Sequence, residues 1–169
     1  TQIIGGTYLG DVVKTARADN GNVMIAYELG GPDAMAYAVF NGKGELIAGP
    51  TTITDHEPDF YSAGVFGDGD FVLAMGEDES EAGLKWNINN QGQFMHSDSI
   101  KFGHGWEPDY RFSIFPVNDF QVNLVYEAYS DPSSYMQTVA KNYLPVKKVS
   151  EAEVSVTNWS AQSVEVVLT

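Results

Sequence analysis

A tryptophan beside two carboxylates is the stretch of this sequence best suited to bind a ligand. Trp106 precedes Glu107 and Asp109, directly after Gly103-His104-Gly105. An indole ring can stack on the apolar face of a sugar, while carboxylates accept hydrogen bonds from its hydroxyl groups. Trp106, Glu107 and Asp109 are therefore candidate ligand-binding residues. The alternative, which we favour, is that Trp106 simply packs against its neighbours.

The same acidic pair occurs earlier in the chain. Glu57-Pro58-Asp59-Phe60 recurs as Glu107-Pro108-Asp109-Tyr110. Glu57 and Asp59 therefore join the ligand-binding candidates.

Three aspartates at equivalent positions, Asp11, Asp59 and Asp109, are candidate metal ligands. Gathered at one face of an array, they could hold Ca²⁺, which takes roughly six to eight oxygen ligands. The alternative, which we favour, is that each aspartate accepts hydrogen bonds from the backbone of a turn. A position that recurs in every repeat more often serves the repeat than a single site.

Two further motifs have the residue types of a metal site without its spacing. Asp68-Gly69-Asp70 lacks the later glutamate of an EF-hand loop, so we expect a hairpin turn there. His56, His96 and His104 lack the short spacing that places two ligands on one face. We expect these histidines in surface loops.

Motifs for catalysis are absent from the sequence. There is no Gly-x-Ser-x-Gly nucleophile motif and no glycine-rich phosphate-binding loop. Carboxylate pairs such as Glu107 and Asp109 suit glycoside hydrolysis, but an acidic chain contains many such pairs by chance. We therefore predict a protein that is not an enzyme.

Internal repeats predict the fold class. Phe40–Ile47 matches Ile88–Met95, one period later, and Ala26–Glu28 matches Val125–Glu127, two periods later. Short alternating apolar runs separated by Gly, Asn and Asp indicate strands and turns. The sequence predicts an all-β, propeller-like array of four-stranded repeats of about 48–50 residues. A β-sandwich is the alternative.

We predict one β domain over residues 1–169, with repeats at 10–54, 58–103 and 108–150 and an incomplete blade formed by 151–169 and 1–5. A propeller that removes exposed edges often places both termini in one blade. Three explanations of the incomplete blade stay open. The chain could form a small propeller of about four blades, two chains could complete one ring, or the sequence could be part of a longer repeat protein.

The expected strands follow from the same alternation. In the first repeat they are Val12–Ala18, Asn22–Glu28, Ala34–Asn41 and Glu45–Ala48. In the second they are Phe60–Phe66, Asp70–Gly76, Gly83–Asn89 and Gln93–Ile100. In the third they are Tyr110–Phe115, Phe120–Glu127, Ser134–Asn142 and Pro145–Val149, with a turn at 117–119. Ala152–Thr157 and Ser163–Leu168 complete the set.

Ala63–Met75 and Leu84–Gly92 resemble repeats of large secreted and surface proteins of bacteria, including calcium-dependent adhesins. The resemblance covers roughly residues 8–149 and implies an adhesive or carbohydrate-binding role outside the cell or on its surface. The chain departs from this pattern at Pro116 and Pro145. It also has Tyr27, Met75 and Tyr126 where such repeats often have Trp.

The charge and composition limit the partners. The 23 acidic and 9 basic residues give a net charge of −14, which argues against binding to nucleic acid or to anionic membranes. The absence of cysteine excludes disulfide and thiolate chemistry. No apolar run reaches the roughly 20 residues of a membrane helix, so we predict no membrane insertion.

The function predicted first is a non-enzymatic binding or adhesion module, with carbohydrate as the candidate ligand and Ca²⁺ as the one cofactor considered. The alternative is a structural or assembly subunit that completes its propeller by pairing with another chain, since an incomplete blade exposes a strand edge. The partner is then a protein, and a homo-oligomer is one form of it. A glycoside hydrolase or lyase ranks third.

Overall fold

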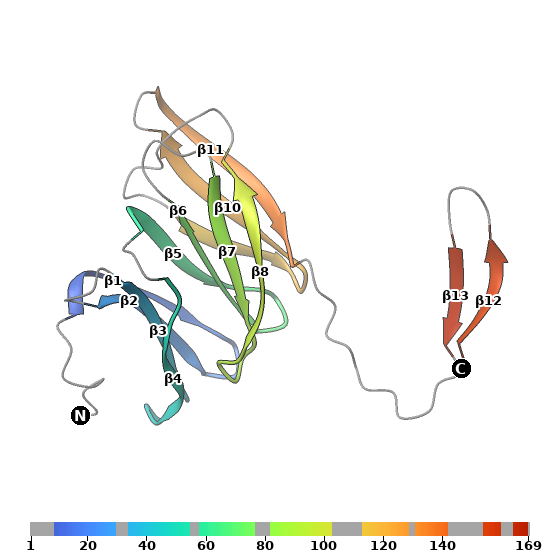
Figure 1. Cartoon of the computed structure of the whole chain (residues 1–169), viewed down its shortest axis with the longest axis horizontal. Helices are drawn as coiled ribbons and strands as arrows, with labels where there is room; N and C mark the ends of the chain where they lie inside the picture. Colours follow the sequence, from blue (N-terminus) through green and yellow to red (C-terminus); the bar gives the residue numbers. More distant parts are fainter. Residues whose placement is uncertain are drawn as a thin grey trace.

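The computed structural model describes residues 9–29, 34–54, 58–76, 82–102, 113–128, 131–141, 154–159 and 164–168, and all its regular elements are β-strands (Figure 1). No helix long and apolar enough to cross a membrane occurs in these segments. The all-β class predicted from the sequence is confirmed.

The strands form three sheets and one hairpin, each with antiparallel neighbours in chain order. Sheet 1 consists of β1 (Leu9–Arg17), β2 (Val23–Leu29), β3 (Ala34–Phe40) and β4 (Leu46–Thr52). Sheet 2 consists of β5 (Phe60–Val65), β6 (Phe71–Gly76), β7 (Ala82–Ile88) and β8 (Phe94–Lys101). Sheet 3 consists of β9 (Ser113–Asn118), β10 (Gln121–Ala128) and β11 (Asp131–Ala140). The hairpin pairs β12 (Val154–Trp159) with β13 (Val164–Leu168) and stands apart from the three sheets in Figure 1.

Matching hairpin turns join the third and fourth strands of sheets 1 and 2. The side-chain oxygen of Asn41 accepts hydrogen bonds from the backbone N–H groups of Lys43 and Glu45. Asn89, at the equivalent position of the next repeat, accepts the same two bonds from Gln91 and Gln93. Gly44 and Gly92 each have φ = 81°, which favours glycine. The sequence match between these segments therefore corresponds to one local geometry.

The three sheets stack face to face, with sheet 2 in the middle. Its first strand, β5, contacts both β1 and β9. A Cβ on Gly64 of β5 would lie 2.5 Å from Cγ2 of Ile114 on β9, so glycine allows these two strands to approach closely. One apolar cluster joins sheets 1 and 2, and a second joins sheets 2 and 3.

Strand β6 belongs to both clusters because its side chains alternate between the two faces of sheet 2. Phe71, Leu73 and Met75 pack against sheet 1, whereas Val72 and Ala74 pack against sheet 3. All six residues of the strand are buried. Burial on both faces explains why the strand is a continuous apolar run rather than an alternating one.

Most predicted strands are found within a few residues of their expected ends. The third repeat differs, because β9 continues through Asn118 and the turn lies at residues 119 and 120, not at 117–119. Pro116 is tolerated inside β9 because this strand is at the edge of its sheet. Strand β4 also extends beyond the predicted end at Ala48, to Thr52.

Several predictions fall outside the described residues, among them the strand at 145–149 and the segment 1–5 of the incomplete blade. The three sheets form an open stack and do not close into a ring. Three packed layers also differ from the two layers of the alternative β-sandwich.

Candidate functional site

Most of the ligand-binding residues predicted from the sequence lie outside the described segments, namely Glu57, Trp106, Glu107 and Asp109. Asp59 is exposed immediately before β5, and Asp11 lies in β1, where its side chain is not described. Within the described residues, no group of three His, Asp or Glu side chains could hold a metal ion. The carbohydrate and calcium sites therefore stay predictions.

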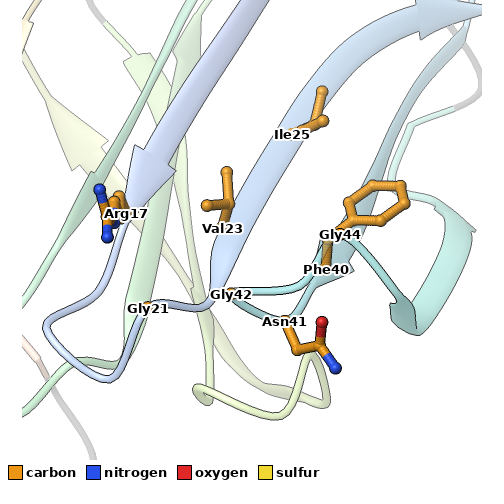
Figure 2. Close-up of a pocket in the computed structure, with 8 residues that line it drawn as sticks. All are labelled: Arg17, Gly21, Val23, Ile25, Phe40, Asn41, Gly42 and Gly44. Carbon is orange, nitrogen blue, oxygen red and sulfur yellow. The ribbon is translucent and has the colours of Figure 1, made fainter. Parts of the chain in front are cut away.

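A hollow of about 530 Å³ opens on the face of sheet 1 that points away from sheet 2, which we call the outer face of sheet 1. It lies at the end of the sheet where the hairpin turns gather (Figure 2). The residues that line it are Arg17, Gly21, Val23, Ile25, Phe40, Asn41, Gly42 and Gly44.

The floor of the hollow is apolar. Val23 and Phe40 are direct partners on β2 and β3, and Ile25 follows on β2 (Figure 2). Both Val23 and Ile25 are half-buried. Arg17, at the end of β1, is the one charged side chain in the lining, and Asn41 is already bonded to its own turn. This lining suits an apolar side chain rather than acid–base chemistry.

The other end of the outer face of sheet 1 is closed. Tyr27 and Ala36, direct partners on β2 and β3, have no exposed surface. Burial raises the pKa of Tyr27, so its hydroxyl stays neutral. That hydroxyl is buried with no hydrogen-bond partner among the described residues.

Two side chains of sheet 1 form hydrogen bonds with the turn between β7 and β8, at what we call junction 1–2. The Tyr37 hydroxyl donates to the carbonyl oxygen of Gly92 at 3.0 Å. The Asn22 amide donates to the carbonyl oxygen of Asn90 at 2.7 Å. Burial raises the pKa of Tyr37, which keeps the hydroxyl protonated as a donor.

Two buried lysines make side-chain contacts between sheets 2 and 3, at what we call junction 2–3, where the Gly67 N–H also donates to the carbonyl oxygen of Asn118. Lys141, whose side chain has no exposed surface, contacts the carboxylates of Asp68 and Asp70 at 2.6 Å each. Its Nζ also lies 5.0 Å from the centre of the Phe66 ring. The Asp68-Gly69-Asp70 segment forms the hairpin turn between β5 and β6, as predicted, and its carboxylates bind an ammonium group.

The second lysine, Lys85 on β7, donates a hydrogen bond to the carbonyl oxygen of Ala140 in sheet 3. Its Nζ lies 3.2 Å from Oδ2 of Asp98, while His96 Nε2 lies 2.8 Å from the other oxygen of that carboxylate. His96 is therefore not in a surface loop as predicted, but in β8 with its ring partly exposed. The alternation of β8 places it on the same face as Asp98.

Burial and charge act in opposite directions on this group. Burial lowers the pKa of Lys85 and outweighs the opposite effect of Asp98. For Asp98 burial alone would raise the pKa, but hydrogen bonds and charge from His96 and Lys85 lower it overall. The carboxylate of Asp98 is thus held ionised by its two neighbours.

Sequence reasoning did not identify either lysine. Each stands alone among strand residues, and no spacing distinguishes it from the other basic residues. The one available signal was the position of Lys85, one repeat after Tyr37. Tyr37 donates a hydrogen bond across junction 1–2, and Lys85 donates one across junction 2–3.

Comparison with known proteins supplies no family. No family model and no curated protein matches the chain. A solved structure with some similarity is a protein of unknown function from Bacteroides caccae, with 13% sequence identity and a TM-score of 0.44. The match covers 82% of this chain, and the chain spans 48% of the length of that protein.

The ion pairs of Lys141 predict an asymmetric response to mutation. The double variant Asp68→Asn and Asp70→Asn should lower the free energy of unfolding by about 3 kcal/mol, because it removes both carboxylates from a buried ammonium group. Lys141→Met should cost less, since the side chains of Asp68 and Asp70 are 30% and 15% exposed and can regain water. Urea unfolding measures both, and the triple variant should recover part of the loss. A double variant as stable as the wild type would contradict this role.

The lowered pKa of Asp98 predicts a pH dependence. A carboxylate with a lowered folded pKa stabilises the protein above its unfolded value of 3.8, and this contribution is lost as the pH falls through the folded pKa. The difference in unfolding free energy between wild type and Asp98→Asn should therefore shrink as the pH falls below 3.8. Urea unfolding over a pH series measures it, and a difference independent of pH would refute the prediction.

Proposed function

We propose that this chain is a non-enzymatic binding and assembly module whose three sheets act as blades of a propeller-like array. The up-and-down order of strands within each sheet supports the proposal. So does the contact of the first strands, since β5 lies against both β1 and β9. In a propeller, the first strands of the blades face the central channel.

The contrast between the two faces of sheet 3 carries the proposal. Val122, Leu124 and Tyr126 on β10 are buried against sheet 2. On the opposite face, which we call the outer face of sheet 3, Phe115 is 53% exposed and Met136 is 69% exposed. Large exposed apolar side chains on a sheet face are typical of interaction surfaces.

The described polar groups favour binding over catalysis. Lys85 has the perturbed pKa that is common in active sites. However, its side chain is only 1% exposed, so a substrate cannot reach it. The hollow on sheet 1 brings no second ionisable group to Arg17 among its lining residues. A binding or assembly module needs neither an accessible reactive lysine nor a pair of ionisable groups.

The proposal also includes three predictions made from the sequence. The ligand is a carbohydrate, the cofactor is Ca²⁺, and the protein is located outside the cell or on its surface. Binding should appear on a glycan array and should be lost in Trp106→Ala, because the indole ring would supply the stacking surface. Repeating the array with EDTA, and measuring the melting temperature with added Ca²⁺, tests the metal. Failure to bind any glycan would eliminate the carbohydrate ligand, and an unchanged melting temperature would eliminate Ca²⁺.

Assembly predicts self-association of the purified chain. The mass measured by sedimentation velocity should rise with protein concentration. It should rise further with added salt, because each chain carries a net charge of −14 and salt screens the repulsion. A strictly monomeric chain at high concentration and high salt would overturn the assembly role and leave the ligand-binding role open.

A further inference from the structure

We propose that the outer face of sheet 1 receives the outer face of sheet 3 from a second copy of this chain, head to tail. The proposed contact uses the same positions that join neighbouring sheets within one chain. The inference rests on the proposed assembly function and names its partner and its two surfaces.

Positions one repeat apart form the two internal junctions. At junction 1–2 the donors are Tyr37 on β3 and Asn22, which directly precedes β2. Their equivalents one repeat later are Lys85 and Asp70. Lys85 bonds Ala140, and Asp70 binds Lys141, so both positions again contact the next sheet.

The receiving side of junction 1–2 has an equivalent on the outer face of sheet 1. The acceptors there are the carbonyl oxygens of Asn90 and Gly92. Their equivalents one repeat earlier are Gly42 and Gly44, which line the hollow (Figure 2). The hollow on sheet 1 therefore lies at the position that, in sheet 2, accepts hydrogen bonds from the neighbouring sheet.

The donor side has equivalents on the outer face of sheet 3. Asn22 corresponds to Gln121, two repeats later. Met136 pairs with Val125 on β10 as Tyr37 pairs with Ala26 on β2, so Met136 occupies the Tyr37 position. A flexible methionine can adapt to an apolar floor such as that of the hollow.

The geometry of the stack excludes a contact between sheets 1 and 3 of one chain. Sheet 2 lies between them, and its strand β6 is buried on both faces. A second copy therefore has to supply sheet 3. The contact forms at the end of the face where the hollow opens, because Tyr27 and Ala36 are already buried at the other end. Such a contact is heterologous and closes into a ring or extends as a filament.

The chain's own hairpin β12–β13 is the competing occupant of the hollow. It consists of two antiparallel strands, which the sequence predicts to be the first two strands of a repeat. Two of the donors across the junctions, Tyr37 and Lys85, lie on third strands, whereas Asn22 precedes a second strand. The hairpin has no third strand among the described residues, whereas sheet 3 has β11.

Cysteine cross-linking can test the contact cleanly, because the 169-residue sequence contains no cysteine. Gly42→Cys in one copy is mixed with Gln121→Cys in a second, tagged copy, under mild oxidation. The corresponding residues Asn22 and Asn90 are joined by a hydrogen bond of 2.7 Å from the Asn22 amide nitrogen to the Asn90 carbonyl oxygen, so the two cysteines would replace residues that meet directly in the equivalent junction. The new Cβ at Gly42 would lie 3.5 Å from the nearest atom, an ordinary contact, so this variant should fold.

The expected result is a disulfide-linked heterodimer at a yield about tenfold above that of either variant oxidised alone, because the contact raises the effective concentration of the two thiols. The matched control is Asn90→Cys mixed with Gln121→Cys, since Asn90 is equivalent to Gly42 but is already bonded to Asn22 of its own chain. This pair should give only the background yield.

A second measurement does not depend on disulfide geometry. Met136→Glu should weaken self-association, whereas Phe94→Glu, at an exposed apolar residue on neither outer face, should not. If the wild type self-associates but the Gly42 and Gln121 pair stays at background, or if Met136→Glu has no effect, this inference is wrong and the assembly function stands. A wild type that is monomeric at every concentration overturns both. Equal cross-linking of Asn90→Cys would also overturn the inference, because it would indicate random collision.

Discussion

Burial of both faces of sheet 2 is the constraint on which the rest of the structure depends. Fully burying a large apolar side chain contributes about 1.5–3 kcal/mol, more than an exposed ion pair. Strand β6 places Phe71, Leu73 and Met75 toward sheet 1 and Val72 and Ala74 toward sheet 3. Removing either neighbouring sheet would expose one face of this strand to solvent. The order of the three sheets therefore follows from one apolar run of six residues.

The polar contacts at the junctions add alignment to this packing. Tyr37 and Lys85 reach carbonyl oxygens of the next sheet, which happens only when the two sheets are in the observed register. A buried ion pair such as Lys141 with Asp68 is weak as a source of stability, because removing the charges from water costs as much as their attraction returns. Its effect is that a misaligned pair of sheets would bury an uncompensated charge.

The same constraint explains why the ends of the stack differ from its middle. Sheet 3 buries Leu124 on its inner face and exposes Met136 on its outer face. The two residues lie in neighbouring strands, so only the face on which each side chain lies separates them. Sheet 1 has the hollow at Gly42 and Gly44 where sheet 2 has a filled turn. The two outer faces of this open stack carry the repeat equivalents of positions that join neighbouring sheets inside it, at Gly42 and Gly44 on sheet 1 and at Met136 on sheet 3.

The sequence by itself determined the local structure. The spacing of Asn41 and Asn89 predicted two equal turns, and alternating apolar residues predicted most strands, because turns and strand faces depend on near neighbours. It did not reveal which lysines are buried, that His96 lies in a strand, or that a hollow opens beside the turn at Gly42. Those features depend on contacts such as Tyr37 with Gly92, 55 residues apart. Only the stacking of the sheets decides which face of a strand meets another sheet and which stays open.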